Sequence, residues 1–398
     1  MNNTIRYIIS FLLYGNENAI DRVGYGKPAE CNIPDVKTIQ LKASAASPLN
    51  NRSSTWQQFI SEVEAAVTTE KISDVFEHYD VVSIVCFFLS RAEELCDSQR
   101  DQHGRLIGKT SVLGKHNMLL IPVLDEYARY LLKQLDLPLP RVEYSKIYLT
   151  HDVDTITQYR HLRGLLGGIK RLELKNVVNS MLSRENDVAF TFRWLKQIDD
   201  TLPDAEQIYF LKANTHQLLH PLDRPQYSSN SCDAKAMKTI VQGENTSFGL
   251  HYSYASADKP ELISKEKQII KSNCYRAHYL RSTIDSYRAL QAGDDFSMGY
   301  ADSVGFRLAT TRCTRWIDPL TLRVTNLTLH PLSVMDATLS SKQYMNLTED
   351  EAYYTCQQVI DTVKRNNGEL CLLWHNSNFY NTYHTNLYRQ IINYISES

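Results

Sequence analysis

From about residue 145 onward, segments with the pattern of strands alternate with segments of helical spacing. Apolar, β-prone runs occur at 147–149, at 206–213, up to 251, at 275–280 and at 369–374. Parallel strands need crossover connections, which helices normally supply. The alternation therefore predicts an α/β fold with a mostly parallel sheet or barrel and helices on the outside.

Polar side chains follow four of these predicted strands directly. They are Asp152 and Asp154 after the first, then His251, then Arg276 and His278, and finally His375. In a barrel the carboxyl ends of the strands line one rim, so we expect these side chains to lie together. In an extended backbone Asp152 and Asp154 point to the same face, about 7 Å apart at their Cα atoms. A divalent cation or a shared proton would relieve their repulsion, although a solvated strand-to-loop turn also accounts for the pair.

A hydrolytic metal centre needs about three protein ligands and one open position for water. Asp154 and His251 are the first two candidates, and His278 is the best remaining imidazole. Each histidine taken alone also fits a structural, hydrogen-bonded role. Their shared position at strand ends favours the metal site.

The same group of residues offers an acid and a base. Asp152 stands beside the candidate ligand Asp154 and can accept a proton from water, whereas His375 can protonate a leaving group. Arg276 can keep Asp152 ionised through a charge-assisted hydrogen bond, or form an ordinary salt bridge.

Five short motifs add a resemblance to a known family. They are Thr150-His-Asp-Val-Asp154, Phe248-Gly-Leu-His251-Tyr-Ser253, Tyr275-Arg-Ala-His278-Tyr-Leu-Arg281, Gly305-Phe-Arg307 and Leu373-Trp-His375-Asn376. In this order they resemble the motifs of the polysaccharide deacetylases with a NodB-type domain, carbohydrate esterase family 4 in the broad sense. The segments 87–94, 103–105 and 125–127 resemble the extra N-terminal domain of a bacterial subgroup.

The resemblance implies an α/β fold: a distorted (β/α) barrel of NodB type over residues 141–398, preceded by a smaller α/β accessory domain over 1–140. A stiff connector containing Pro138 and Pro140 follows the amphipathic helix predicted for 122–135, which places the boundary at the same point.

It also implies a metal-dependent hydrolase, with Zn²⁺ as the expected ion, that removes N-acetyl or O-acetyl groups from a carbohydrate. By resemblance, Asp152 is the base, Asp154 a ligand and His375 the acid, and Asp295 orients His375. The family's second motif carries another histidine four residues after the first, where this chain has Ala255. The third ligand is then His278 or water, or the metal is held weakly.

Composition limits the remaining choices. The net charge of -2 and the absence of a basic stretch give no reason to expect nucleic acid or an anionic membrane as partner. The eight cysteines form no CxxC pair, which favours a reducing compartment. No secretory signal and no apolar run long enough to cross a bilayer is apparent, so we expect a cytoplasmic protein without an integral membrane segment.

Three other functions fit part of the pattern. The Asp152-Val-Asp154 sequence also suits a haloacid-dehalogenase-type phosphatase that uses Mg²⁺. A glycosyltransferase is a further possibility, but residues 1–140 contain no glycine-rich phosphate loop. A degenerate deacetylase would bind a glycan without turnover. Metal content and the product released, acetate or phosphate, discriminate among the hydrolases and the binding protein.

Overall fold

The structure is a computed structural model that describes residues 2–31, 33–214, 220–224 and 227–397. The chain forms two compact units. Unit 1 comprises Met1–Ser145, Met298–Pro331 and Asp361–Glu369, and unit 2 comprises Lys146–Ser297, Leu332–Ile360 and Leu370–Ser398. The first segment of unit 1 ends close to the predicted boundary at 140, but unit 1 also includes two later segments.

Unit 1 is mainly helical. Its helices are α1 Asn3–Leu12, α2 Trp56–Thr68, α3 Ile72–His78, α4 Val81–Leu89, α5 Val112–Lys115 and α6 Val123–Gln134. Its strands are the parallel pair β1 Val23–Tyr25 and β2 Ile39–Leu41, and the antiparallel pair β8 Thr314–Asp318 and β9 Arg323–Pro331.

The apolar run at the start of α4 has a β-rich composition but is helical throughout. Asp80 caps the helix, because its carboxylate accepts a hydrogen bond from the Ser83 backbone N–H at 2.9 Å. All nine residues of α4 are buried, so the helix shows no polar face. Fully buried helices and strands have the same apolar pattern, and only the cap distinguishes them here.

Buried ion pairs join the segments of unit 1. Glu94 accepts hydrogen bonds from Arg91 Nε at 2.7 Å and from an Arg307 terminal nitrogen at 2.6 Å. Burial opposes ionisation of this carboxyl, but the two guanidinium groups lower the pKa of Glu94 to about 2. Asp125 likewise accepts hydrogen bonds from Thr310, Thr311 and Arg312. Residues that carry the resemblance at the N-terminus, and the Gly305-Phe-Arg307 motif, therefore hold unit 1 together.

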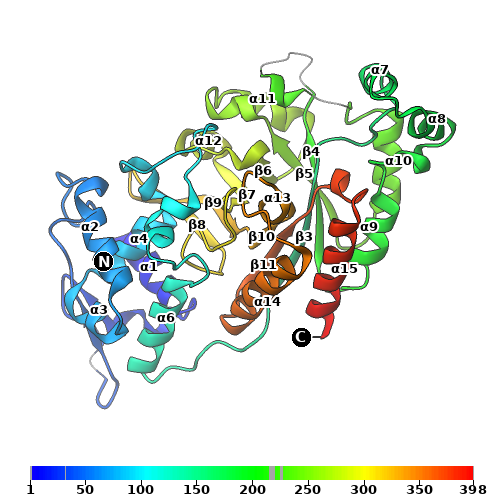
Figure 1. Cartoon of the computed structure of the whole chain (residues 1–398). Coiled ribbons are helices and arrows are strands. Elements are labelled where there is room, and N and C mark those ends of the chain that lie inside the picture. Colours follow the sequence, from blue (N-terminus) through cyan, green and yellow to red (C-terminus); the bar gives the residue numbers. More distant parts are fainter. Residues whose placement is uncertain (1, 32, 215–219, 225–226, 398) are drawn as a thin grey trace. The chain divides into compact units, whose positions relative to one another are not determined.

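Unit 2 has a mixed α/β fold with a curled sheet. Its strands follow the order β10-β11-β3-β4-β5-β6-β7 within this sheet (Figure 1). The strands are β3 Lys146–Val153, β4 Glu206–Lys212, β5 Thr246–Tyr252, β6 Cys274–Ala277, β7 Ala292–Met298, β10 Val334–Met335 and β11 Glu369–Leu373. The pairs from β3 to β7 are parallel, and so is β10 with β11. The predicted parallel α/β arrangement is therefore present, in a half-barrel that is compatible with a distorted barrel.

Helices connect these strands. They are α7 Leu162–Lys170, α8 Leu174–Leu182, α9 Phe192–Asp199, α10 Cys232–Val241, α11 Leu262–Ile269, α12 Ile284–Leu290, α13 Asp336–Ser340, α14 Glu349–Arg365 and α15 Thr382–Glu397. Helices α9, α10 and α15 lie beside β3, β4 and β5 (Figure 1). A capping box opens α14, where Thr348 and Glu351 exchange hydrogen bonds.

The register of the parallel strands brings the polar strand ends level with one another. Asp152 pairs with Phe210 across β3 and β4, Lys212 pairs with His251 across β4 and β5, and His251 pairs with Arg276 across β5 and β6. Neighbouring strands lie about 4.8 Å apart, so side chains at equal height along the edge come within contact distance. The edge formed by the carboxyl ends of these strands therefore gathers the candidate residues.

Gly249 in β5 makes room for one side chain at this edge. A Cβ atom at this position would lie 2.3 Å from Cδ1 of Phe210. The Phe210 ring in turn lies under the guanidinium of Arg276, whose central carbon is 4.8 Å from the ring centroid. The glycine thus allows the close packing that supports Arg276 from below.

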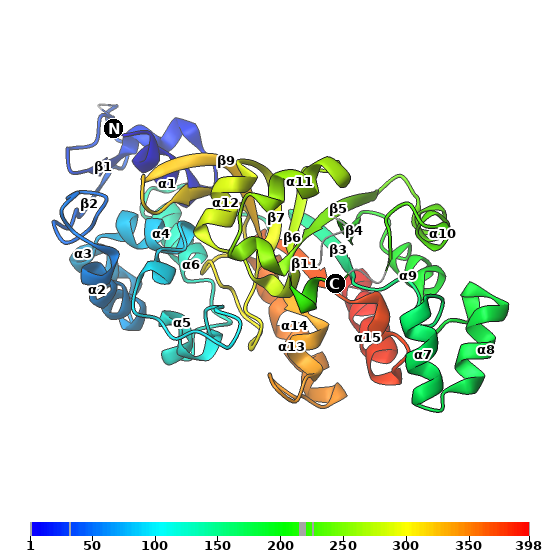
Figure 2. The same cartoon turned by 90° about the horizontal axis from the view of Figure 1, so that it is seen from above.

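Helices α7 and α8 lie side by side and form a hairpin at the periphery of unit 2 (Figure 2). Across the described residues, no helix has both the length and the apolar character needed to cross a bilayer.

Candidate metal centre

Three side chains expected to bind a metal come together in unit 2. Asp154 follows β3, His251 lies in β5, and His278 starts the short turn after β6. One ligand atom from each lies within 4.8 Å of the other two. His251 Nε2 is 3.6 Å from Asp154 Oδ1, and His278 Nε2 is 3.4 Å from the same oxygen. The structure therefore places His278 where the third candidate ligand was expected.

The hydrogen bonds behind the two imidazoles fix their orientation. His251 Nδ1 lies 3.0 Å from the Arg276 carbonyl oxygen, and His278 Nδ1 lies 3.1 Å from Asp223 Oδ1. Because both partners are acceptors, each Nδ1 carries a proton and each Nε2 turns a lone pair toward Asp154. His251 Nε2 is buried and has no hydrogen-bond partner in the described part of the chain. Two lone pairs facing a carboxylate oxygen repel one another, and a cation among them removes the repulsion.

The spacing of the ligand atoms also fits a cation. Ligands about 2.1 Å from a tetrahedral metal are about 3.4 Å apart, because the tetrahedral angle fixes that distance. The two distances to Asp154 Oδ1, 3.4 and 3.6 Å, agree with this value. The residues present therefore fit a divalent metal ion with two nitrogen ligands and one oxygen ligand.

Asp223 supports His278 from a short turn outside the sheet, and sequence reasoning missed it. Its carboxylate also accepts hydrogen bonds from the backbone N–H groups of Tyr254 at 2.5 Å and Ala255 at 2.8 Å. Although burial opposes this, the bonds from His278 and these amides lower the pKa of Asp223. Ala255, which occupies the position of the missing motif histidine, thus helps to hold the partner of His278.

Lys212 is a second residue that sequence reasoning missed. It ends β4, is only 8% exposed, and places its Nζ 2.8 Å from Asp154 Oδ1. Burial raises the pKa of Asp154, but the ammonium of Lys212, the largest opposing influence, helps to hold this pKa well below its usual range. The Lys212 ammonium and a divalent ion would compete for the same oxygen. The strand-end pattern that identified the other residues also applies to Lys212.

Asp152 and Arg276 are adjacent, as expected. Asp152 Oδ1 lies 3.4 Å from an Arg276 terminal nitrogen, and Asp152 Oδ2 lies 3.5 Å from His251 Nε2. Arg276 is fully buried and donates a hydrogen bond to Thr150 Oγ1 at 2.9 Å. The Asp152 carboxylate, oriented by Arg276, therefore faces the candidate metal ligands.

His375 lies on the other side of Asp154, with 3.9 Å between His375 Nε2 and Asp154 Oδ2. Asp336, directly after β10, accepts hydrogen bonds from His375 Nδ1 and from the His375 backbone N–H, both at 2.8 Å. Burial lowers the pKa of His375, but Asp336 outweighs this effect and raises the pKa to about 10. The imidazole therefore holds a proton at neutral pH.

The expectation that Asp295 orients His375 is corrected, because the carboxylate bonded to His375 is that of Asp336. Asp295 lies buried in β7, where it accepts hydrogen bonds from Tyr287 at 2.6 Å and from the backbone N–H and the hydroxyl of Ser297 at 3.0 Å. These bonds give Asp295 a structural role within the sheet.

A cleft of about 1130 Å³ opens beside the candidate metal centre. Asp154 and His278 line this cleft together with residues of α7 and of the turn at 221–224. Among the described lining residues Asp154 is the one acid, whereas the basic ones are Arg163, Lys170, Arg171, Lys212 and Arg224. The cleft is therefore suited to a ligand that is polar or negatively charged.

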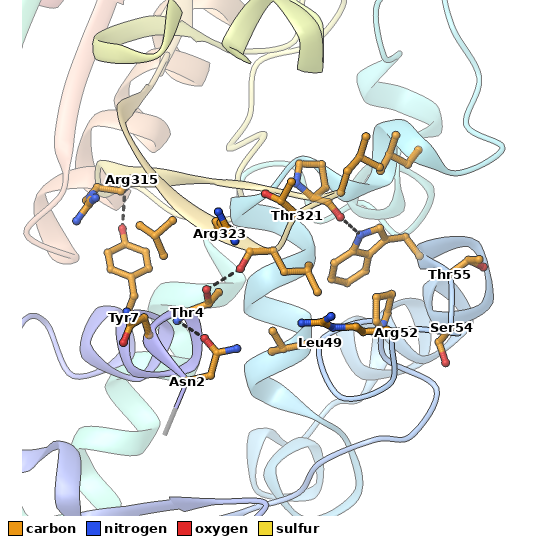
Figure 3. Close-up of a pocket in the computed structure, with 18 of the residues that line it drawn as sticks. Asn2, Thr4, Tyr7, Leu49, Arg52, Ser54, Thr55, Arg315, Thr321 and Arg323 are labelled. Carbon is orange, nitrogen blue, oxygen red and sulfur yellow. Dashed lines mark hydrogen bonds between the residues drawn. The ribbon is translucent and has the colours of Figure 1, made fainter.

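Unit 1 contains a separate cleft of about 1490 Å³ (Figure 3). Several polar groups in its wall bond to backbone atoms: Thr4 donates to the Leu322 carbonyl at 2.6 Å, and Tyr7 accepts from the Arg315 N–H at 2.7 Å. The described residues lining it include no aspartate, glutamate, histidine or cysteine. This cleft offers no acid–base pair and no metal ligands, so the candidate site lies in unit 2.

The chain is similar to a family of unknown function and, more distantly, to a solved structure. A family model described as a family of unknown function, DUF7033, matches residues 5–140, a segment that ends where the sequence predicts a boundary. A search of curated proteins finds no match. A crystal structure from Mycobacterium smegmatis, described as a polysaccharide deacetylase by assignment, is similar at 11% identity with a TM-score of 0.40, covering 65% of this chain and 86% of that one.

Proposed function

We propose that this chain is a metal-dependent hydrolase that removes an acetyl group from the nitrogen, or from an oxygen, of a carbohydrate. One observation carries the proposal: Asp154, His251 and His278 meet at one strand edge, with a paired carboxylate and a protonated imidazole on either side. That set contains the ligands, the base and the acid that hydrolysis of an amide or ester requires. On the basis of the same residues, we also propose that unit 2 is a distorted barrel of NodB type.

Asp154, His251 and His278 would hold the ion, and Zn²⁺ is the proposed metal because two imidazoles and one carboxylate are a common catalytic zinc set. When bound, the ion would polarise the acetyl carbonyl and lower the pKa of water at the site. Asp223 keeps the Nδ1 proton on His278, and the Arg276 carbonyl keeps it on His251. Both Nε2 atoms are therefore available as ligands.

Asp152 acts as the general base in this proposal. Its carboxylate accepts a proton from the attacking water, and Arg276 orients it. Arg276 is itself fixed by Thr150 and by the Phe210 ring, so it is a positioning residue. The attack forms a bond from the water oxygen to the acetyl carbon.

His375 acts as the general acid. Its Nδ1 proton is held by Asp336, which leaves Nε2 facing the carboxylate of Asp154. Transfer of the Nε2 proton to the departing nitrogen breaks the carbon–nitrogen bond and yields acetate and an amino sugar. Asp336 stabilises the imidazolium before this transfer and so acts as a positioning residue.

The proposal is tested by incubating the purified chain with an N-acetylated oligosaccharide and measuring acetate. We expect release with bound Zn²⁺, loss after dialysis against a chelator, and recovery when the ion is restored. Phosphate release from an aryl phosphate with Mg²⁺, and no acetate, would instead identify a phosphatase. Absence of any product would contradict the hydrolase.

Lys212 supports a second candidate, a protein that binds glycan without turnover. Its ammonium places a positive charge of the chain itself against Asp154, which can offset the repulsion that otherwise calls for a metal ion. Acetate release in the assay above excludes this candidate, whereas glycan binding without acetate and without bound metal supports it.

Removing this lysine charge should strengthen metal binding. We expect Lys212→Met to raise the affinity for Zn²⁺ about ten-fold or more, because the ammonium no longer competes for Asp154 Oδ1. A competition titration with a chromogenic chelator measures the change. Lys146→Met is the matched control, since Lys146 pairs with Glu206 at the opposite ends of β3 and β4. Unchanged or weaker metal binding in Lys212→Met would show that Lys212 does not compete with the ion.

A further inference from the structure

The hairpin of α7 and α8 exposes an unusual amount of apolar surface. Of the 18 large hydrophobic residues that are exposed in the described part of the chain, eight lie between residues 162 and 182: Leu162, Leu166, Ile169, Leu172, Leu174, Val178, Met181 and Leu182. Single exposed hydrophobic residues are ordinary, but such a concentration marks an interaction surface.

The exposed residues form one face of each helix. Leu162, Leu166 and Ile169 in α7 are spaced by four and three residues, as are Leu174, Val178 and Met181 in α8. This spacing brings side chains to the same side of a helix.

The opposite face of the hairpin is packed by small side chains. A Cβ atom at Gly168 would lie 2.6 Å from Cγ2 of Val177 and 2.8 Å from the Tyr159 ring. The hydroxyl of Ser180 donates to Asp187, and the Ser180 carbonyl accepts from Arg160 at 2.7 Å. The inner face therefore holds the hairpin in place, and the large apolar side chains outside are not needed for this.

The exposed surface of the hairpin is also basic. Residues 162–182 contain Arg163, Lys170, Arg171 and Lys175 but one acid, Glu173, which gives four minus one, or +3, in a chain of net charge -2. Arg171 pairs with Glu173 at 2.8 Å. The three remaining basic residues are exposed, and none has an ion-pair partner among the described residues. Because the net charge of the whole sequence is close to zero, it conceals this local excess of positive charge.

We propose that the α7–α8 hairpin docks on an anionic lipid surface. A helical element that combines an outward apolar face with flanking lysine and arginine lies in the interface between lipid headgroups and acyl chains, and the basic residues favour anionic lipids. This proposal departs from the expectation, based on net charge, that an anionic membrane is no partner. The positive charge also repels a second copy of the same face, which disfavours self-association.

Docking would bring the cleft to the lipid surface. Arg163, Leu166 and Lys170 belong to α7 and also line the cleft that leads to Asp154. In combination with the proposed function, on which this step rests, the substrate is an acetylated carbohydrate attached to a lipid. The basic cleft wall also suits an anionic group near the link between sugar and lipid.

Sedimentation with lipid vesicles tests the docking. We expect the full chain to bind vesicles that contain phosphatidylglycerol about ten-fold more strongly than vesicles of phosphatidylcholine alone, and to dissociate as salt increases. The double variant Leu172→Asp, Leu182→Asp should bind at least about ten-fold more weakly. These residues are 83% and 78% exposed and do not line the cleft. Leu172 has a φ of +62°, which aspartate adopts more readily than leucine.

The matched control is Val142→Asp, Leu320→Asp, which places the same charges at exposed apolar positions outside the hairpin, 65% and 58% exposed. It should bind vesicles as the wild type does. The proposal is overturned if the wild type does not bind anionic vesicles or if the hairpin variant binds equally well. It is also overturned if, without lipid, the wild type is a dimer and the hairpin variant a monomer.

A parallel assay separates this proposal from the proposed function. Acetate release from a soluble N-acetylated oligosaccharide should be equal in the wild type and the hairpin variant. Release from an N-acetylated glycolipid in anionic vesicles should fall about ten-fold in the variant alone. If neither substrate yields acetate, the hydrolase proposal fails while the vesicle-binding result still decides the docking. Equal rates on both substrates overturn the assignment of a lipid-attached substrate.

Discussion

Asp152→Asn is expected to lower kcat for acetate release by about 10³-fold or more while the chain retains its full content of divalent metal. The amide cannot accept a proton from water, but it has nearly the same shape as the carboxylate that Arg276 holds. Metal content is measured by elemental analysis after gel filtration, and kcat by acetate release at saturating substrate. Full activity in this variant would show that Asp152 is not the base.

The neighbouring variant Asp154→Asn provides the contrast. Asp154 supplies the oxygen that lies 3.4 Å from His278 Nε2 and 3.6 Å from His251 Nε2. Its loss should therefore lower metal content and activity together, and a large excess of Zn²⁺ should restore part of the activity. Two carboxylates, two residues apart in the chain, would thus have distinguishable roles. Equal metal content in both variants would contradict the division of roles.

The second large effect is expected for His375→Gln, and it should depend on the leaving group. An amine must be protonated as it departs, so release of acetate from an N-acetylated sugar should fall about 10²- to 10⁴-fold. An activated aryl acetate releases a phenolate that needs no proton, and its hydrolysis should fall less than about ten-fold. The ratio of the two rates, measured with one enzyme preparation, isolates the role of the acid.

Two further variants locate the partner of His375. Asp336→Asn should show the same leaving-group dependence in weaker form, because Asp336 accepts the Nδ1 hydrogen bond. Asp295→Asn removes a buried carboxylate that bonds to Tyr287 and Ser297 instead, so it should leave the ratio of rates unchanged. An equal loss on both substrates in His375→Gln would contradict proton donation by this residue.

The gathering of the candidate residues could be predicted because it follows from topology. Strand ends in a parallel sheet lie at one edge, and the register places Lys212, His251 and Arg276 side by side. The prediction of His278 as third candidate ligand needed only this rule, since His278 is the best remaining imidazole at a strand end. Lys212 obeys the same rule, but a lysine is not a usual metal ligand, so its strand-end position alone did not single it out.

Other features have no local signal. Asp336 follows β10, which has two residues, too few to show an alternating pattern. Asp223 lies in a short turn, and its link to His278 depends on how distant segments pack. The segments 298–331 and 361–369 join unit 1 through contacts that are far apart in sequence. Each of these features depends on tertiary contacts, which hydrophobic periodicity does not record.

The turn at residues 221–224 connects metal affinity to events in the cleft. Asp223 fixes the ring of His278, and the next residue, Arg224, lines the cleft. An anionic ligand that shifted Arg224 would also move the carboxylate behind a candidate ligand histidine, and would so alter the strength with which that histidine binds an ion. Thermodynamic linkage makes the effect mutual, since the ion must change the affinity for the ligand by the same factor.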